Sequence, residues 1–301
     1  RSFYPDAAFE KAGAKISDRA AAIKDADVIA TIGQPGADVV DQLTAGQTLL
    51  GLLQPLTDLD YVKELATKKV NALAFELLPR TVSRAQTMDV LSSQASVAGY
   101  KAALLAADQF SRYLPMMITA AGTAKPTKVL VLGTGVAGLQ AIGTAKRLGA
   151  MVSGYDIRPA SRGEVESLGA TFLTTSVSAT GEGGYARALT PEETAQQQAE
   201  LAEFIAQNDV IITTAQVPGR RPPVLVTQKS VDAAKAGTLF IDLAASELGG
   251  NVAGSQPEKT VTTKQQAQIV GAGDMASQLP ASASDMFAKN VQAVLNAIVQ
   301  D

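Results

Sequence analysis

The chain of 301 residues contains neither cysteine nor histidine. Without cysteine it can form no disulfide and carry out no thiolate chemistry. Without histidine it lacks the most common general acid–base side chain, a Ser-His-Asp triad and the usual zinc ligands. Any reaction must therefore depend on Asp, Glu, Lys, Arg, Tyr or Ser side chains or on a bound cofactor, and we predict no metal site.

Long apolar runs and a strong excess of one charge are also lacking. No run reaches the ~18–20 residues that cross a bilayer, and no signal peptide is recognisable. The net charge of −3 gives no basic footprint for nucleic acid. With 46% hydrophobic and 18% charged residues, the composition is typical of a soluble α/β protein, and the length suits two domains.

The most informative stretch that is present runs from Lys128 to Gly138, KVLVLGTGVAG. An apolar strand leads directly into Gly133, Gly135 and Gly138, and a helical segment follows. In such a GxGxxG turn the first glycine allows the tight turn, the second lets a pyrophosphate approach the backbone, and the third lets the helix pack on the strand. The N–H groups at the start of the helix then hold the pyrophosphate.

A second apolar run ends at Asp156, at the distance from the glycines where a carboxylate accepts the hydroxyls of an adenine ribose. An acid at this position favours NAD over NADP, because it repels a 2′-phosphate. The combination of strand, turn, helix and acid indicates a dinucleotide site. The alternative is a glycine turn in some other kind of α/β protein.

Strand-like and helix-like segments alternate along the chain, which predicts parallel sheets covered by helices. In the first part we expect strands at 27–33, 48–53 and 70–75. A segment with sustained helical periodicity spans 86–113, and the small, polar segment 119–128 resembles a hinge.

Beyond that hinge, further strands are expected at 129–132, 152–156, 170–173, 209–214, 238–243 and 269–270. The Gly-, Ser- and Thr-rich stretch 175–188 is expected to be a surface loop. We therefore predict an α/β fold with two Rossmann-like, doubly wound parallel-sheet domains linked by long helices. Residues 1–125 with 275–301 would form an N-terminal-type domain, and residues 126–274 the NAD-binding domain.

The run from Arg84 to Tyr100, RAQTMDVLSSQASVAGY, resembles the signature loop and helix of the NAD(H)-binding component, domain I, of proton-translocating transhydrogenase. Further segments match in order over nearly the whole chain: Thr119–Thr123, Gly133–Leu148, Glu166–Gly169, Gly183–Ala186, Thr213–Ala215, Pro218–Gly219, Ile241–Ala244, Gly249–Asn251 and Phe287–Asn290. The same superfamily contains alanine dehydrogenase, which resembles this chain in fold but uses a histidine that is absent here.

The resemblance implies a function. Domain I binds NADH or NAD⁺ and passes a hydride directly to NADP(H) on a separate domain III, while a membrane domain II couples the transfer to proton movement. No protein group then needs to carry a proton at the nicotinamide, so the lack of histidine fits, and the task of the protein is to orient two nicotinamide rings. The alternatives are a stand-alone dehydrogenase of the alanine dehydrogenase type and a non-catalytic NAD-binding module.

The resemblance also implies roles for residues near the reacting rings. Gln86 matches a glutamine that helps to align the nicotinamides, and Asp89 and Ser92 match residues at the nicotinamide-ribose and carboxamide end. Arg80 matches an arginine that pairs with the aspartate and contacts the cofactor. It lies one residue further from Gln86 than the family pattern has, so Arg84 is its rival, and a solvated surface charge is the alternative for both.

The other predicted cofactor-binding residues lie at the phosphate turn, in the adenosine-ribose segment, in a loop that closes over bound nucleotide, and after a strand. They are Gly133, Gly135, Val136, Ala137 and Gly138; Asp156, Ile157 and Arg158; Gly183, Gly184 and Tyr185; and Thr214, Ala215, Gln216 and Val217. At Val136 the backbone N–H is the useful group. An ordinary surface charge is the alternative for Arg158, a loop anchor for Tyr185, and a turn without a ligand for the last group, which follows the carboxyl end of a strand.

The resemblance further implies partner subunits that carry domains II and III, a homodimer, and a cytoplasmic location at the inner face of the membrane. Family members have a further segment before the one that begins here at Arg1, and it supplies the first strands of the N-terminal domain. We therefore expect that domain's sheet to be shortened or completed differently, and NAD binding through the second domain to survive.

Overall fold

The computed structural model describes residues 2–80, 82–180, 186–217 and 219–299. The chain forms two compact units, which consist of Arg1–Gln94 with Pro280–Asp301 and of Ala95–Leu279. The chain passes from the first unit to the second inside helix α5 (Val90–Gln109) and returns to the first at the start of α10 (Pro280–Ile298).

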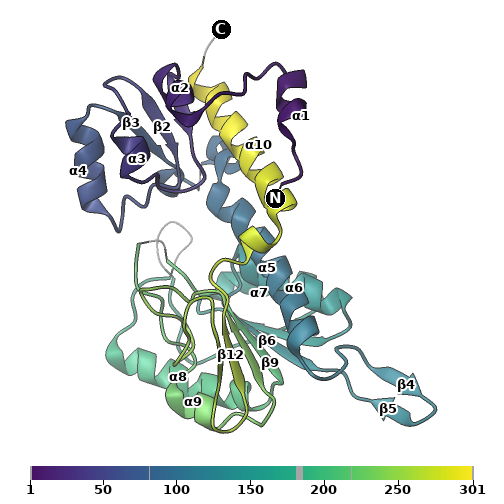
Figure 1. Cartoon of the computed structure of the whole chain (residues 1–301). Coiled ribbons are helices and arrows are strands. Elements are labelled where there is room, and N and C mark those ends of the chain that lie inside the picture. Colours follow the sequence, from purple (N-terminus) through teal and green to yellow (C-terminus); the bar gives the residue numbers. More distant parts are fainter. Residues whose placement is uncertain (1, 81, 181–185, 218, 300–301) are drawn as a thin grey trace. The chain divides into compact units, whose positions relative to one another are not determined.

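The second unit is built on a seven-stranded sheet with the order β11-β12-β10-β9-β6-β7-β8 (Figure 1). Its strands are β6 (Lys128–Leu132), β7 (Met151–Tyr155), β8 (Thr171–Leu173), β9 (Val210–Thr213), β10 (Leu239–Asp242), β11 (Thr260–Thr262) and β12 (Gln268–Gly271). All neighbours are parallel except β11, which runs antiparallel to β12. Leu132 pairs with both Tyr155 and Thr213, so the carboxyl ends of β6, β7 and β9 lie level.

Helices cover both faces of this sheet. One face carries α5, α6 (Val136–Arg147) and α7 (Arg162–Ser167), and the other carries α8 (Pro191–Ala206) and α9 (Gln228–Asp232). Short 3-10 turns, η3 (Pro159–Ser161) and η5 (Ala276–Gln278), complete the unit's helical segments within the described residues. Helix α8 begins where it does because Thr190 and Glu193 form a reciprocal capping box.

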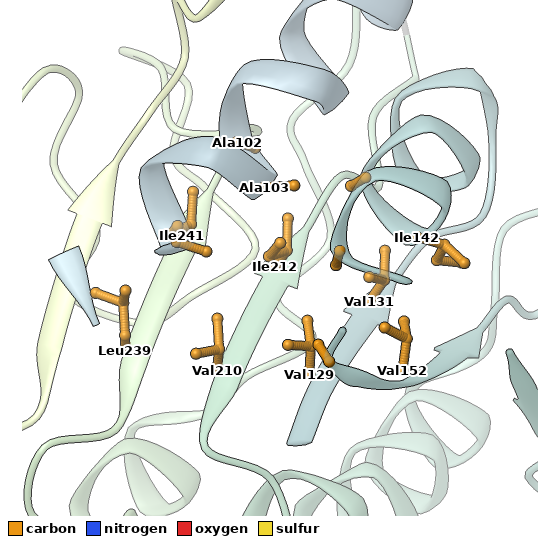
Figure 2. Packing of buried hydrophobic residues seen from close by; sticks show 14 of the residues in the cluster. Ala102, Ala103, Val129, Val131, Ile142, Val152, Val210, Ile212, Leu239 and Ile241 are labelled. Carbon is orange, nitrogen blue, oxygen red and sulfur yellow. The ribbon is translucent and has the colours of Figure 1, made fainter. Parts of the chain in front are cut away.

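The central strands are apolar on both sides because both faces are covered. Val129 and Val131 of β6 lie in the cluster on the face that carries α5 and α6, as Figure 2 shows. The alternate residues Leu130 and Leu132 pack into the opposite cluster with α8 and α9. This burial on both faces fixes β6 in the middle of the sheet, and β6 leads directly into the glycine turn.

The first unit contains a smaller parallel sheet with the order β1-β2-β3. Its elements are α1 (Asp6–Lys11), α2 (Arg19–Lys24), β1 (Val28–Ala30), α3 (Ala37–Val40), β2 (Thr48–Gly51), α4 (Leu59–Thr67), β3 (Asn71–Ala74), and the 3-10 segments η1 (Phe75–Leu77) and η2 (Ser83–Met88). Leu49 of β2 packs with α2, α3 and α4, whereas Leu50 packs with Phe75, Val90 of α5 and Val294 of α10.

The predicted α/β class with a Rossmann-like parallel sheet is confirmed, and each predicted strand is present at nearly the predicted position. Two local predictions are wrong. The expected hinge at 119–128 contains a hairpin, β4 (Met117–Thr119) and β5 (Gly122–Ala124), whose turn depends on Gly122 at φ 118°. The expected helix at 86–113 is divided, because Asp89 ends η2 and caps α5.

Within the part of the chain that the structure describes, no helix is both long enough and apolar enough to cross a membrane.

Candidate functional site

The glycine turn after β6 is packed so closely that two of its positions exclude a side chain. Gly133 has φ 94°, and a Cβ there would lie 2.9 Å from Thr214 Oγ1. A Cβ at Gly138 would lie 1.9 Å from the carbonyl oxygen of Gly133. Gly135, by contrast, has no atom within 4 Å of its Cβ position. The turn is therefore tight on its inner side and open at Gly135, as a pyrophosphate site requires.

The turn lies where the direction of the sheet's winding changes. From β6 the chain passes through α6 to β7 on one side, and it later returns through α8 to β9 on the other side of β6. In open α/β sheets, ligands bind outside the carboxyl ends of the strands at such a switch point. Val136 and Ala137 belong to the first turn of α6, where backbone N–H groups have no partner within the helix. The described residues thus fit a dinucleotide.

Asp156 follows β7 and points its carboxylate at the glycine turn. Its Oδ2 accepts hydrogen bonds from Thr134 N at 2.9 Å and from Arg158 Nη2 at 2.8 Å. Its Oδ1 accepts from Arg158 Nε at 2.8 Å and from the Arg158 backbone N–H at 2.9 Å. Burial by itself raises the pKa of Asp156, but the hydrogen bonds and charge of Arg158 outweigh it and bring the pKa below its ordinary value. Arg158 is thus an ion-pair partner rather than an isolated surface charge.

The residues after β9 form a loop that makes hydrogen bonds to its surroundings at almost every position. Thr214 Oγ1 donates to the Gly133 carbonyl at 2.9 Å, and Gln216 Nε2 donates to the Leu243 carbonyl at 2.7 Å. Ala215 is held through both its N–H and its carbonyl, and Val217 accepts from the Arg220 N–H at 3.1 Å. The loop is therefore a fixed wall opposite the glycine turn. Ile157, on the β7 side, accepts from the Ala179 N–H at 3.0 Å.

Sequence reasoning gave no role to two buried polar residues that hold this wall. Asp242 ends β10 and accepts hydrogen bonds from Thr213 Oγ1 at 2.9 Å and from the N–H groups of Ala244 and Val252 at 3.0 and 3.1 Å. Asn251 binds the backbone of Ala215. The available signal was a charged residue at the end of the apolar run TLFIDL, a position that usually requires several hydrogen-bond partners.

The first unit contains a second cluster of predicted residues, built on the start of α5. Arg80 Nε donates to Asp89 Oδ2 at 2.8 Å, and Arg80 Nη2 donates to Ser92 Oγ at 2.7 Å. Ser92 Oγ donates in turn to Asp89 Oδ2 at 2.6 Å, and Ser92 N donates to Asp89 Oδ1 at 2.9 Å. The structure therefore pairs Asp89 with Arg80, despite the extra residue in the spacing.

The charge state of this cluster follows from its contacts. Burial raises the pKa of Asp89, but hydrogen bonds from Ser92 and the guanidinium of Arg80 outweigh it, so the pKa lies below its ordinary value. Asp89 is therefore an anion at neutral pH, and Arg80 is held in place by it.

Arg84 and Gln86 lie on η2 and are exposed. Arg84 lines a shallow depression of about 390 Å³ that it shares with Lys289 of α10, and neither Arg80 nor Asp89 lines it. Among the described residues, no hydrogen bond of the Gln86 side chain is found, so its amide is available to a ligand or partner. The predicted residues Gly183, Gly184 and Tyr185 lie outside the described residues. No group of three or more metal-ligating side chains is found in the described ranges.

Both halves of the chain match known protein families. The N-terminal domain of "Alanine dehydrogenase/PNT" matches residues 1–98, and the C-terminal domain matches residues 102–301. The chain is 45% identical over 296 residues to a protein of Rhodospirillum rubrum that is named as the first portion of NAD(P) transhydrogenase subunit alpha. The match covers 95% of this chain and 76% of that protein.

A solved structure, that of a transhydrogenase from Sinorhizobium meliloti, superposes with a TM-score of 0.87 at 41% identity. The match covers 99% of this chain and 82% of the other. The alanine dehydrogenase of Bacillus subtilis (strain 168) is 24% identical over 251 residues, which is 82% of this chain and 61% of that protein. Similarity to transhydrogenases is therefore considerably closer than similarity to this alanine dehydrogenase.

Proposed function

The chain belongs to the alanine dehydrogenase/PNT family, as its motifs predicted, and we propose that it is the NAD(H)-binding component of an NAD(P) transhydrogenase. In this role it exchanges a hydride between its own NAD(H) and NADP(H) on a partner component. A separate membrane component couples the exchange to proton movement. We assign NAD binding to the second unit, and orientation of the nicotinamide to the Arg80–Asp89–Ser92 cluster with Gln86.

The observation that carries this proposal is a dinucleotide-type glycine turn with an acid after the next strand, in a chain without histidine. A dehydrogenase that oxidises an alcohol or an amine needs a group to accept a proton from its substrate. A transfer between two nicotinamides needs none, because only a hydride moves. The composition therefore favours a second nicotinamide as the other reactant.

Different residues would bind different parts of the nucleotide. The first-turn N–H groups of α6 at Val136 and Ala137 would hold the pyrophosphate, with Gly135 leaving room for it. Asp156 would accept the adenine-ribose hydroxyls and repel a 2′-phosphate, which selects NAD. The bound NADH supplies the hydride, and the protein supplies alignment.

Alignment at the nicotinamide end would depend on the cluster at the start of α5. Arg80 is oriented by Asp89 and Ser92, which fix the direction of its guanidinium. Gln86, exposed on η2, would donate from its amide toward the rings. Neither group changes its protonation state during transfer, in keeping with a role in orientation.

We also propose that the chain acts as a homodimer at the inner face of the cytoplasmic membrane, together with NADP-binding and membrane components. The Rhodospirillum rubrum relative is named as a portion of one subunit, which supports the existence of partners. The hairpin β4–β5 extends away from the seven-stranded sheet in Figure 1. It exposes Ile118, and Met116 is exposed just before it, which supports a contact between copies.

The test combines the purified chain with a purified NADP-binding component, NADPH and an oxidised NAD analogue with a distinct absorbance. We expect reduction of the analogue only when both proteins are present. The chain alone is tested with NAD⁺ and L-alanine, where turnover would indicate a stand-alone dehydrogenase. Tight NADH binding in calorimetry without transfer in the mixture would indicate a non-catalytic module, and a preference for NADPH would contradict the role of Asp156.

A further inference from the structure

The buried amide of Asn251 holds the wall opposite the glycine turn from its far side. The residue has no exposed surface. Its Oδ1 accepts from Ala215 N at 2.9 Å, and its Nδ2 donates to the carbonyls of Ala215 at 2.9 Å and Pro223 at 2.7 Å. Both amide protons and the amide oxygen are therefore used to hold one loop, which leaves the side chain no alternative orientation.

Asn251 is itself fixed by its own backbone and by its neighbours. Its carbonyl accepts from the N–H groups of Leu225 and Val226, both at 2.9 Å. The next N–H, that of Val252, is bound by Asp242 Oδ2 at 3.1 Å. The preceding residue, Gly250, lies so close to Asp242 that a Cβ would stand 2.2 Å from Oδ2. Asp242, at the carboxyl end of β10, therefore fixes the position from which the Asn251 amide contacts Ala215.

The loop that Asn251 holds is in direct contact with the glycine turn. Thr214 Oγ1 binds the Gly133 carbonyl, and a Cβ on Gly133 would lie 3.0 Å from Ala215 N. A displacement of Ala215 by a few tenths of an ångström would therefore change the distance between this loop and the glycine turn. Because Asn251 is fully buried, it acts on the nucleotide site through the loop that it holds at Ala215 and Pro223.

We propose that Asn251 is a positioning residue for the bound nicotinamide nucleotide, which sets the Thr213–Val217 wall at the distance from the glycine turn that the nucleotide requires. The proposal rests on the assignment of NAD(H) to this crevice. Asp242 holds the same wall at Thr213, the first residue of the wall, whose Oγ1 donates a hydrogen bond to the Asp242 carboxylate.

The decisive variant is Asn251→Asp, which preserves the shape of the side chain. As a carboxylate it still accepts from Ala215 N, but it places a second oxygen against the carbonyls of Ala215 and Pro223. Burial raises the pKa of such a carboxyl into the range between about pH 5 and 8. Its protonated form regains one O–H donor, so lowering the pH restores one of the two lost hydrogen bonds.

Calorimetry of NADH binding to the full chain is the readout. We expect the dissociation constant of Asn251→Asp to be about 10- to 100-fold weaker than that of wild type near pH 8, the effect of a lost buried hydrogen bond. Near pH 5.5 we expect the affinity of Asn251→Asp for NADH to rise at least about threefold, while the dissociation constant of wild type does not change with pH. A purely structural role would lower stability without this pH-dependent return of affinity.

Asn208→Asp is the matched control. Asn208 is also a buried asparagine that donates to a carbonyl, that of Phe204 at 2.8 Å, but it precedes β9 and lies at the opposite end of the sheet from the crevice. We expect it to lose stability and to bind NADH as wild type does at every pH. Equal weakening by Asn208→Asp, or wild-type affinity in Asn251→Asp across the pH range, would overturn the proposal.

Thr213→Val is a second variant for the case that Asn251→Asp does not fold. It is nearly isosteric and removes only the hydrogen bond to Asp242, so we expect NADH to bind about 3- to 10-fold more weakly. Unchanged NADH affinity in Thr213→Val would count against the proposal that buried side chains fix the position of the Thr213–Val217 wall. If wild type itself fails to bind NADH, the proposed function fails, and the role of Asn251 in nucleotide binding fails with it.

Discussion

Asp89 and Asp156 are each paired with an arginine and each accept hydrogen bonds from a nearby backbone N–H. In both pairs the carboxylate is more buried than the guanidinium. An anion in such a position does not serve as a proton carrier near neutral pH, because its pKa is lowered. Both carboxylates are therefore suited to hold arginines and ligand hydroxyls in place.

The Asp89 pair leads to a prediction about stability and pH. Asp89→Asn keeps a side-chain oxygen for Ser92 N but removes the charge that binds Arg80. We expect the free energy of unfolding near neutral pH to fall by about 1–3 kcal/mol, the contribution of hydrogen bonds to charged groups. Because the folded-state pKa is below the ordinary value, this contribution is complete above about pH 4 and is lost as the pH falls through the folded-state pKa.

Urea denaturation of wild type and Asp89→Asn at a series of pH values measures this difference. Asp60→Asn, which breaks an exposed pair with Lys63, is the control and is expected to change stability by less than about 0.5 kcal/mol. A difference between wild type and Asp89→Asn that disappears between neutral pH and about pH 5 would contradict the lowered pKa.

For individual residues, sequence patterns predicted the contacts that local spacing determines and missed those between residues far apart in the chain. The glycines and Asp156 are separated by one strand–helix–strand unit of fixed geometry, so their proximity could be predicted. The pairing of Arg158 with Asp156 was open, because a surface charge has the same local pattern. Asn251 meets Ala215 from 36 residues away, across loops whose paths no periodicity encodes.

At the scale of elements, helices α5 and α6 meet at a glycine. Gly99 lies in the interior of α5, and a Cβ there would stand 2.0 Å from the carbonyl oxygen of Ala137 in the first turn of α6. A glycine in a helix interior costs about 1 kcal/mol relative to alanine, so its presence there needs a structural reason. The structure gives its reason: only glycine lets α5 approach the turn that is predicted to bind pyrophosphate.

Gly99→Ala is expected to force the two helices apart. Overpacking of this kind typically costs about 1–3 kcal/mol, and it would displace the N–H groups of Val136 and Ala137, so NADH binding should weaken as well. Thermal unfolding and calorimetry measure the two effects.

Gly163→Ala is the matched control, because Gly163 lies in α7 with no atom within 4 Å of its Cβ position. It should stabilise the protein by up to about 1 kcal/mol through helix propensity and leave NADH affinity unchanged. If Gly99→Ala changed stability and NADH affinity no more than Gly163→Ala does, the contact between α5 and α6 would have no energetic role.

The boundaries of elements were predictable where the chain carries strong local signals. Both faces of the central strands are apolar, and these strands were found from sequence almost to the residue. The hairpin β4–β5 was missed because Thr119–Ala124 has small side chains with no alternating pattern, so its pairing depends on the turn at Gly122.

At the scale of the whole molecule, the α/β class followed from alternating strand and helix signals, because each βαβ unit is nearly complete within a short window. The assignment of function needed motifs as well. A parallel sheet with a glycine turn hosts many chemistries, and only the Arg84–Tyr100 run, with the absence of histidine, directed the choice toward transhydrogenase.

The hairpin allows a test of the proposed homodimer. Ile118 is 77% exposed and Met116 is 59% exposed, so the hairpin and the segment before it present adjacent apolar side chains to solvent. Ile118→Asp would place an unpaired charge in any contact that buries this residue. Analytical ultracentrifugation is expected to show a shift from dimer to monomer, with a dimer dissociation constant raised at least about tenfold.

The control is Ile32→Asp, since Ile32 is 69% exposed but lies in the first unit after β1. It should leave the oligomeric state unchanged. NADH affinity should survive in Ile118→Asp, because the hairpin leads into the amino end of β6 whereas the glycine turn follows its carboxyl end. A wild-type chain that sediments as a monomer, or an Ile118→Asp variant that remains a dimer, would remove the hairpin from the proposed interface.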